Sequence, residues 1–457
     1  MSYPPRLIET EYPDFGATDT PPDWRLPLPI YQQRLEAVRA RMDRDGLTHL
    51  AVYADREHFA NLAWLTGFDP RFEEALLILG PAPKPLLLAG NECMAYLPAS
   101  PLVQANLLDI RRYQPFSLPD QPQGESALLE GAAIDAHSRI GVAGWKSYAQ
   151  PHQIDAPSYL VDALRFAAGY ENVTNAAALF FNPTDGLRTT VTPEEIAFFE
   201  WTNTLASEGM RRVIDSIRPG ARDYDLLEHA RYNGVPLSAH MTLKCGANRV
   251  SLASARGERI TLGGRFSCGI AYWGANCCRC GWVANGPDDL PPEASGYVEH
   301  FAGPYFAAMA AWFEALHIGA PGAALHHAIH SRLPADPFHV FLNAGHLIHL
   351  DEWVSSPVYA ASDVPLRSGM VMQSDVIPSH PCFYSSRMED GYVLADFDLQ
   401  SELATRYPTL LARCHARRRW MRHTLGIPVH DDVLPLSNLA GIVPPYLLQP
   451  RLIFALC

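Results

Sequence analysis

One pattern occurs twice in this chain and limits the folds that it can adopt. Residues 207–230 and residues 307–330 each read as a long helix, a Pro-Gly break and a second helix. A Pro-Gly pair ends a helix, because proline cannot continue one and glycine favours the position after its last turn. Strand-like runs lie between and after the two copies. The spacing predicts an α+β domain with an internal pseudo-twofold duplication.

The part of the chain before this pattern alternates apolar strands with helices. Apolar residues recur at helical spacing after residue 30, namely Tyr31, Leu35, Val38 and Met42, and Gly46 is placed to end that helix. The runs LTHLAVY, EALLILG, PLLLAG and RIGVAGW read as buried strands, and SYLVDALRFAA reads as an amphipathic helix. This alternation predicts an α/β domain.

A boundary between the two domains is expected near residue 185. The segment FFNPTDGLRTTV is dense in turn residues, and the sequence Thr192-Pro193-Glu194-Glu195 that follows is typical of a capped helix start. We therefore predict four parts: an irregular arm (1–28), the α/β domain (29–185), the duplicated domain (186–425) and a Pro/Leu-rich tail (426–457) that wraps an existing surface.

Charge and cysteine content narrow the classes of partner. The 457 residues include 36 Lys and Arg against 49 Asp and Glu, a net charge of −13, which argues against a nucleic-acid partner. No apolar stretch approaches the roughly 20 residues of a membrane span, and the N-terminus lacks an export signal. Nine cysteines, an odd number, are typical of reduced thiols. We expect a cytoplasmic protein with no membrane partner.

Motifs in the second half resemble the creatinase/aminopeptidase P family. They are GHLIH (345–349), SGMVMQSDVIP (368–378) and SSRMEDGYVL (385–394), and NLAWLTGF in the first half resembles the N-terminal domain of that family. The resemblance covers roughly residues 30–425. It implies the pita-bread fold, preceded by a creatinase-type N-terminal domain.

The metallopeptidases of this family hold two cations with two Asp, one His and two Glu, and each position can be located here. The resemblance places the family's histidine at His346, and its two glutamates at the positions of Asp375 and Glu389. The family's two aspartates fall at the positions of Ser267 and Cys278. Both aspartates are therefore missing.

Two histidines that assist peptide cleavage in the family are missing as well. Their positions are occupied by Ala253 and Trp353. The resemblance therefore argues against a standard Xaa-Pro peptidase.

Two kinds of site remain open. One is a single Zn or Fe ion held by Cys278, His346, Asp375 and Glu389, a plausible set of ligand types for either metal. The other contains no cofactor, as in creatinase, where the resemblance implies a histidine that carries the proton. The adjacent Cys277 leaves the register uncertain, because a slip of one residue reverses the face of a strand.

In the cofactor-free site, His346, Asp375 and Glu389 would be the catalytic groups. His346 is the first choice as proton carrier, because histidine titrates near neutral pH, and His240 and His349 are alternatives. Arg387 is expected either to orient a substrate carboxylate or to pair with a neighbouring acid. Trp353 would form an apolar wall.

These features lead to three hypotheses for function. The first is a creatinase-like hydrolase or lyase that acts at a C–N bond of a small polar molecule and forms a homodimer, as the resemblance implies. The second is a hydrolase or peptidase that depends on the single metal ion. The third is a binding protein on a decayed peptidase scaffold. An enclosed pocket with His346 beside a carboxylate favours an enzyme, whereas a site filled by Trp353 favours the binding protein.

Overall fold

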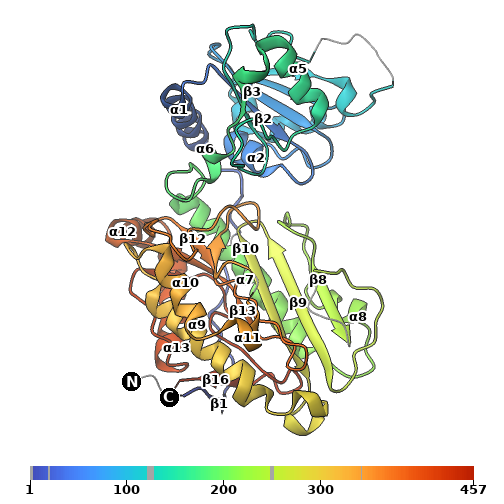
Figure 1. The fold of residues 1–457 in the computed structure, drawn as a ribbon, viewed down its shortest axis with the longest axis vertical. Coiled ribbons are helices and arrows are strands. Elements are labelled where there is room, and N and C mark those ends of the chain that lie inside the picture. Colours follow the sequence, from blue (N-terminus) through green and yellow to red (C-terminus); the bar gives the residue numbers. More distant parts are fainter. Residues whose placement is uncertain (1–3, 19–20, 121–127, 247–251, 341, 457) are drawn as a thin grey trace. The chain divides into compact units, whose positions relative to one another are not determined.

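The computed structural model describes residues 4–18, 21–120, 128–246, 252–340 and 342–456. Contacts divide the chain into two compact units, one of residues 23–188 and one of residues 1–22 with 189–457 (Figure 1). No helix in the described ranges combines the length and the apolar character needed to cross a bilayer. The two units are described separately below.

The first unit contains a mixed six-stranded sheet in the order β5-β4-β3-β2-β6-β7. Its strands are β2 (His49–Ala54), β3 (Ala75–Leu79), β4 (Leu86–Ala89), β5 (Asp109–Arg112), β6 (Ile140–Ala143) and β7 (Val173–Asn175). Its helices are α1 (Leu28–Asp45), α2 (Ala60–Thr66), α3 (Cys93–Tyr96), α4 (Pro101–Gln104), α5 (Ser158–Ala168) and α6 (Ala178–Phe181). The α/β character expected of this region is present.

Helix α1 shows why the periodicity was informative. Tyr31, Val38 and Met42 are buried, and Gly46 ends the helix in the left-handed conformation that glycine adopts at low cost. Four of the sheet strands, β2, β3, β4 and β6, are buried along their whole length, as expected of apolar runs without alternation.

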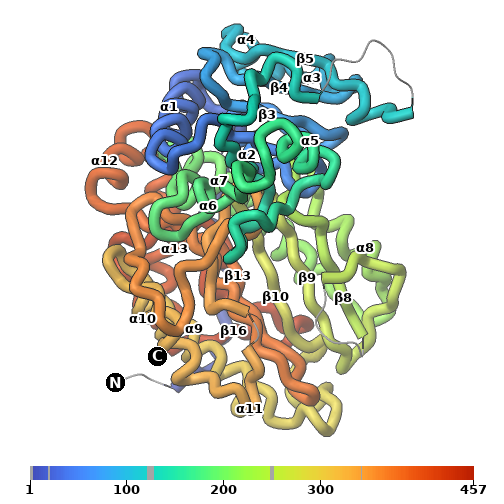
Figure 2. The backbone as a smooth tube through the Cα atoms, turned by 45° about the horizontal axis from the view of Figure 1, so that its top comes forward, coloured from blue at the N-terminus to red at the C-terminus, as the bar shows by residue number. Residues whose placement is uncertain are grey.

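The second unit contains two four-stranded sheets with the orders β13-β10-β9-β8 and β11-β12-β14-β15. The first is built from β8 (Thr242–Gly246), β9 (Gly264–Tyr272), β10 (Ala275–Val283) and β13 (Arg387–Glu389). The second is built from β11 (His346–Leu347), β12 (Val371–Gln373), β14 (Gly391–Leu394) and β15 (Val433–Pro435). Figure 2 follows the path of the chain through this unit.

Helices accompany these sheets. They are α7 (Pro193–Asp215), α8 (Asp223–Glu228), α9 (Gly303–Ala315), α10 (Gly322–His330), α11 (Ala335–Phe338), α12 (Phe397–Arg406) and α13 (Pro408–His423). Helix α7 packs against β9 and β10, and it begins with the predicted capping box. There the Thr192 hydroxyl accepts from the Glu195 amide, and the Glu195 carboxylate accepts from the Thr192 amide. Both copies of the repeated pattern form a helix pair, while their duplication stays a prediction.

The arm and the tail differ from their expected description. Residues Arg6–Glu9 form strand β1, which pairs antiparallel with β16 (Leu452–Ala455) in the tail, so the arm is not irregular throughout. Residues 433–447 are buried, so this part of the tail does not simply wrap the surface. The reason is composition: these segments carry enough Leu, Val and Ile to enter the interior.

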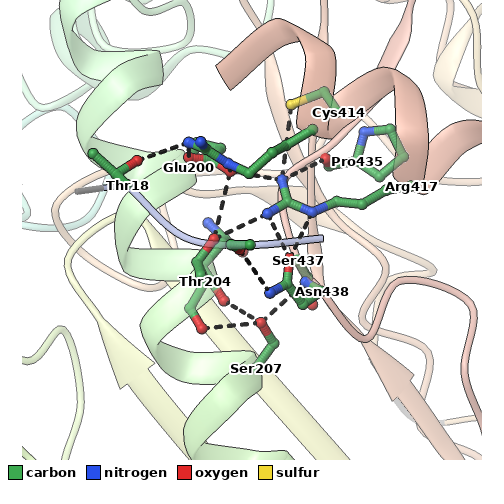
Figure 3. Close-up of polar contacts among 12 residues, drawn as sticks. Thr18, Glu200, Thr204, Ser207, Cys414, Arg417, Pro435, Ser437 and Asn438 are labelled. Atoms are coloured by element: carbon green, nitrogen blue, oxygen red, sulfur yellow. Dashed lines mark hydrogen bonds and ion pairs between the residues drawn. The ribbon is translucent and has the colours of Figure 1, made fainter. Parts of the chain in front are cut away.

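A buried ion network joins α7 to α13 and the tail (Figure 3). Glu200 is fully buried and contacts Arg413 at 2.6 Å and Arg417 at 2.8 Å. Arg417 also donates to Asn438, and Arg413 donates to the Thr18 hydroxyl of the arm. The network therefore connects segments from both ends of the chain within this unit.

Candidate functional site

Strand β10 presents alternate side chains to opposite faces of its sheet. Asn276, Cys278 and Cys280 share one face, and Cys277 and Arg279 share the other. The register pairs Cys278 with Glu389 of β13, and Asn276 donates to the Glu389 carboxylate. Cys277 instead lies 3.8 Å from the Arg279 guanidinium. The sequence left the choice between the two cysteines open, and the structure places Cys278 on the side of Glu389.

His346 lies at the start of the short strand β11 and is fully buried. The preceding Gly345 has φ 107°, and a Cβ atom there would lie 2.9 Å from Trp312 and 3.0 Å from the Gln373 carbonyl, so only glycine fits. The His346 Nδ1 atom lies 3.1 Å from the carbonyl of Leu347, to which it donates. This leaves Nε2 to face the interior of the site.

Three carboxylates surround the Nε2 atom of His346. It lies 3.2 Å from Glu352 Oε1 and 3.8 Å from Asp375 Oδ2. Glu389 lies close by: one atom each of His346, Glu352 and Glu389 fall within 4.8 Å of one another. We call His346, Glu352, Asp375 and Glu389 the acid–histidine cluster.

Asn276 connects two members of this cluster. Its Nδ2 atom donates to Glu389 Oε1 at 2.7 Å and to Glu352 Oε1 at 3.4 Å. Gln373 in turn donates to the Asn276 carbonyl at 3.0 Å. An amide donor between two carboxylates stabilises their negative charge and fixes their orientation.

Asp375 follows strand β12, which ends at Gln373. Its side chain is 8% exposed, and Oδ1 has no hydrogen-bond partner. The Gln373 Oε1 atom is also buried without a partner. Buried oxygen atoms without partners are costly, so both mark a place where a bound group would gain hydrogen bonds or coordination.

Burial and mutual contact shift the protonation of the cluster. Although burial acts against a charged imidazole, Glu352 raises the pKa of His346 to about 9, so the ring is protonated at neutral pH. Burial and the neighbouring carboxylates raise the pKa of Glu389, and burial raises that of Asp375. The cluster therefore contains one cationic acid and two carboxyl groups that retain a proton more readily than usual.

Arg387, on β13 opposite Cys280, lies beside the cluster. The sequence left open whether it pairs with Glu389 or Asp390, and Asp390 is engaged elsewhere: it forms a 2.7 Å ion pair with Arg279. Arg387 is 6% exposed, and its Nε atom has no hydrogen-bond partner. Glu389 and Asp375 act on its charge, but neither forms an ion pair with it within 4.0 Å among the described residues.

The remaining predicted residues differ in their placement. The Trp353 ring lies 4.5 Å from the His346 ring, so this aromatic side chain covers one side of the imidazole. His349 contacts Glu195 at 3.0 Å and packs against Phe199, so it lies beside the N-terminal turns of α7. His240 is exposed and contacts the Leu252 carbonyl. The structure therefore does not bring His240 or His349 into the acid–histidine cluster.

Two members of the site were missed from the sequence, Glu352 and Asn276. Glu352 directly precedes Trp353, the position to which the resemblance assigned a helper histidine, and lies in an irregular segment without periodicity. Asn276 is two residues before Cys278, so strand alternation was a signal that it shares the same face.

The site has the donors for one divalent cation. His346, Glu352 and Glu389 offer a nitrogen and two oxygen ligands, the atom types preferred by Zn²⁺ and Fe²⁺, and the unpaired Asp375 oxygen lies beside them. The donation from His346 Nδ1 to a carbonyl is the support typical of a metal-binding histidine. This set differs from the predicted one: Glu352 stands in it, and Cys278 and Asp375 do not.

Comparison with known proteins shows the fold. No family model matches the sequence, and no curated protein matches it. Among solved structures, the dipeptidase PepE from Mycobacterium ulcerans is 19% identical, with a TM-score of 0.62, over 81% of this chain and 95% of that chain. The prolidase from Pyrococcus horikoshii OT3 is 13% identical, with a TM-score of 0.61, over 79% of this chain and 95% of that one.

The same fold also occurs in a protein of a different kind. The N-terminal domain of the FACT complex subunit SPT16 from Cicer arietinum is 16% identical, with a TM-score of 0.57, over 81% of this chain and 95% of that chain. At these identities the similarity concerns the fold and not the activity. The chain thus has the two-domain fold of prolidases and dipeptidases.

Proposed function

We propose that this protein is a hydrolase that cleaves a C–N bond in a small polar molecule at the acid–histidine cluster. One observation carries the proposal: the buried His346 Nε2 atom lies between Glu352 and Asp375, and the Asp375 Oδ1 atom beside it has no partner. Clustered ionisable groups with shifted pKa values in a buried place are typical of reactive sites.

The chemistry follows from the protonation states. The carboxylate of Asp375 takes a proton from a water molecule whose oxygen attacks the carbon of the C–N bond. As that bond breaks, the nitrogen takes the Nε2 proton of His346 and leaves as an amine. Asp375 then returns its proton to His346 across the 3.8 Å between them, so that water is the only molecule consumed.

A second candidate is the same hydrolysis with the help of one metal ion. The grouping of His346, Glu352 and Glu389 within 4.8 Å favours it, because these three would hold the ion. A bound divalent cation would act as a Lewis acid and make a water molecule more acidic. Arg387 and Asp375 would remain free to contact the substrate.

A binding protein without catalysis is the third candidate. The contact between Trp353 and His346 favours it, because the ring fills space beside the imidazole. The fold shared with a FACT complex subunit is consistent with this candidate. The 3.2 Å contact of the fully buried His346 with a carboxylate favours an enzyme instead, and we give it more weight because clustered groups with shifted pKa values are typical of reactive sites.

The test is to measure amine or ammonia release from small amides, ureas, guanidines and Xaa-Pro dipeptides. The full chain is assayed after chelator treatment, with and without added Zn²⁺ or Fe²⁺. We expect release without added metal, none from Xaa-Pro dipeptides, and loss of release in Asp375→Asn but not in Asp363→Asn, an exposed control. Release only with metal supports the second candidate, and binding without release supports the third.

The cellular setting and assembly belong to the same proposal. We propose a cytoplasmic homodimer, on the basis of the reduced-thiol composition and the family resemblance. Light scattering on the purified full chain tests the assembly: a mass near twice 50.6 kDa supports the dimer, and a mass of a single chain contradicts it.

A further inference from the structure

Arg387 lies on a sheet face where the side chains level with it on the neighbouring strands are uncharged. The register places Arg387 opposite Cys280, and Cys280 opposite Ser267 of β9. The next row on the same face consists of Glu389, Cys278 and Gly269. The row that contains Arg387 therefore offers only a thiol and a hydroxyl from the neighbouring strands β10 and β9.

Two of the acids close to Arg387 are already engaged. Asp390 is paired with Arg279 at 2.7 Å, and Glu389 accepts from Asn276 at 2.7 Å. The Arg387 Nε atom is buried without a hydrogen-bond partner, on a side chain that is 6% exposed. A buried guanidinium N–H group without a partner is costly, and an anion that supplies two oxygen atoms would satisfy it.

A further donor lies close to Arg387. Burial raises the pKa of Tyr384, whose hydroxyl group lies next to Ser267 and Cys280, so it stays protonated. Neutral hydroxyl and thiol groups around one guanidinium form a place that accepts a single negative charge. A dianion such as phosphate fits poorly, because Asp375 and Glu389 act on the same guanidinium.

From this geometry we infer that Arg387 binds a carboxylate group of the substrate; the inference rests on the proposed hydrolysis. Arg387 and Glu389 are two residues apart on β13, which is about 7 Å along a strand. That spacing suits a carboxylate a few bonds away from the reacting C–N bond. The substrate class is therefore an N-acyl, N-carbamoyl or N-amidino amino acid other than an Xaa-Pro dipeptide.

Matched pairs of probes test this inference. N-Acetylglycine, N-carbamoylglycine and guanidinoacetate are each compared with their primary amides, which lack only the negative charge. Binding to the full chain is measured by calorimetry, and cleavage is measured by chromatography of the products. The variants are R387Q, R387K and the exposed control R332Q.

We expect wild type and R332Q to bind at least one acid more tightly than its amide. R387Q should weaken binding of that acid about 10- to 100-fold and change binding of the amide less than about threefold. R387K should weaken binding of the acid about 5- to 20-fold, because lysine keeps the charge but loses the bidentate contact. If R387Q does not fold, as judged by circular dichroism, the binding data of R387K alone test the inference.

Three results would overturn the inference: no acid binds at 10 mM, acid and amide bind equally to wild type, or the variants weaken both members of a pair equally. A different result separates the two proposals. If acids bind through Arg387 but no probe is cleaved, the carboxylate site stands and the proposed hydrolysis of these compounds fails.

Discussion

Asn276 donates a 2.7 Å hydrogen bond to Glu389 from the adjacent strand, and the same amide reaches Glu352 at 3.4 Å. Two carboxylates from different parts of the chain are thereby held on one side of His346. The resemblance led us to expect Ser267 and Cys278 at two aspartate positions on this sheet, and the face carries an amide, a thiol and a hydroxyl group. The site is thus built around one histidine and three acids, of which His346, Glu352 and Glu389 are grouped closely enough to hold one ion.

The number of bound metal ions is the first prediction. If Ser267 and Cys278 stand at the two aspartate positions, as the resemblance implies, the chain should hold no more than one ion after saturation with Zn²⁺ and removal of excess. The E352Q variant should bind Zn²⁺ at least tenfold more weakly than wild type, because the substitution removes one of the three grouped ligands. The C278S variant should bind Zn²⁺ with the affinity of wild type. Mass spectrometry of the metal content and competition with a chromophoric chelator provide the measurements.

E299Q is the control for this experiment, because Glu299 is exposed in the same unit. Two ions per chain, or an equal loss of affinity in C278S and E352Q, would contradict the ligand set described above.

Much of the site could be predicted from local motifs. His346, Asp375, Arg387 and Glu389 lie in the short motifs that carry the family resemblance, and the structure brings all four close together. Strand alternation with the register then decides between Cys277 and Cys278, a choice that depends on pairing between strands rather than on sequence alone.

Glu352 could not be predicted in the same way. It lies in an irregular segment, where no periodicity indicates which side chain points inward, and the resemblance drew attention to the next residue, Trp353, instead. The role of His349 depends on Glu195, which is far away in the sequence and contacts it only in the folded unit. In the tail, an abundance of proline indicated an irregular path but not burial.

The ion network around Glu200 provides a stability prediction. Glu200→Gln leaves Arg413 and Arg417 buried without their carboxylate (Figure 3), which should lower the free energy of unfolding by about 3–5 kcal/mol. The surface control is Glu402→Gln, whose carboxylate pairs with Arg406 and should contribute only about 0–1 kcal/mol. Urea unfolding at pH 7 measures both. Equal effects of the two substitutions would show that the network does not stabilise the fold.

The same network predicts a loss of stability in acid. Although burial acts in the opposite direction, the arginines lower the pKa of Glu200 below its usual value. Its contribution is therefore complete above the pKa of the unfolded chain, about 4.3, and is lost as the pH falls through the lower folded value. The difference between wild type and Glu200→Gln should shrink correspondingly in acid. A difference that stays constant down to pH 2 would contradict this.

In the first unit, Asp69 should give the opposite dependence of stability on pH. Burial raises its pKa to about 6, against the effect of Arg71. Asp69 therefore stabilises the fold only while it is protonated, and this contribution is lost as the pH rises from about 4 to about 6. Asp69→Asn should be more stable than wild type by about 1–3 kcal/mol at pH 7.5 and equal to it at pH 3.5.

Asparagine keeps the oxygen that accepts from the Arg71 amide, so the turn is preserved in this variant. Thermal unfolding at the two pH values measures the difference, with Asp43→Asn on the exposed side of α1 as the control. A stabilisation by Asp69→Asn that is the same at both pH values would refute the explanation by burial of a charge.

The central claim is that His346 delivers the proton to the nitrogen of the broken C–N bond. The most direct measurement is kcat/KM for amine release by wild type, His346→Asn and His327→Asn, the last being an exposed histidine of α10. The account predicts that His346→Asn loses at least about 100-fold and that His327→Asn stays within twofold of wild type. Amine release by His346→Asn at the wild-type rate would contradict the claim.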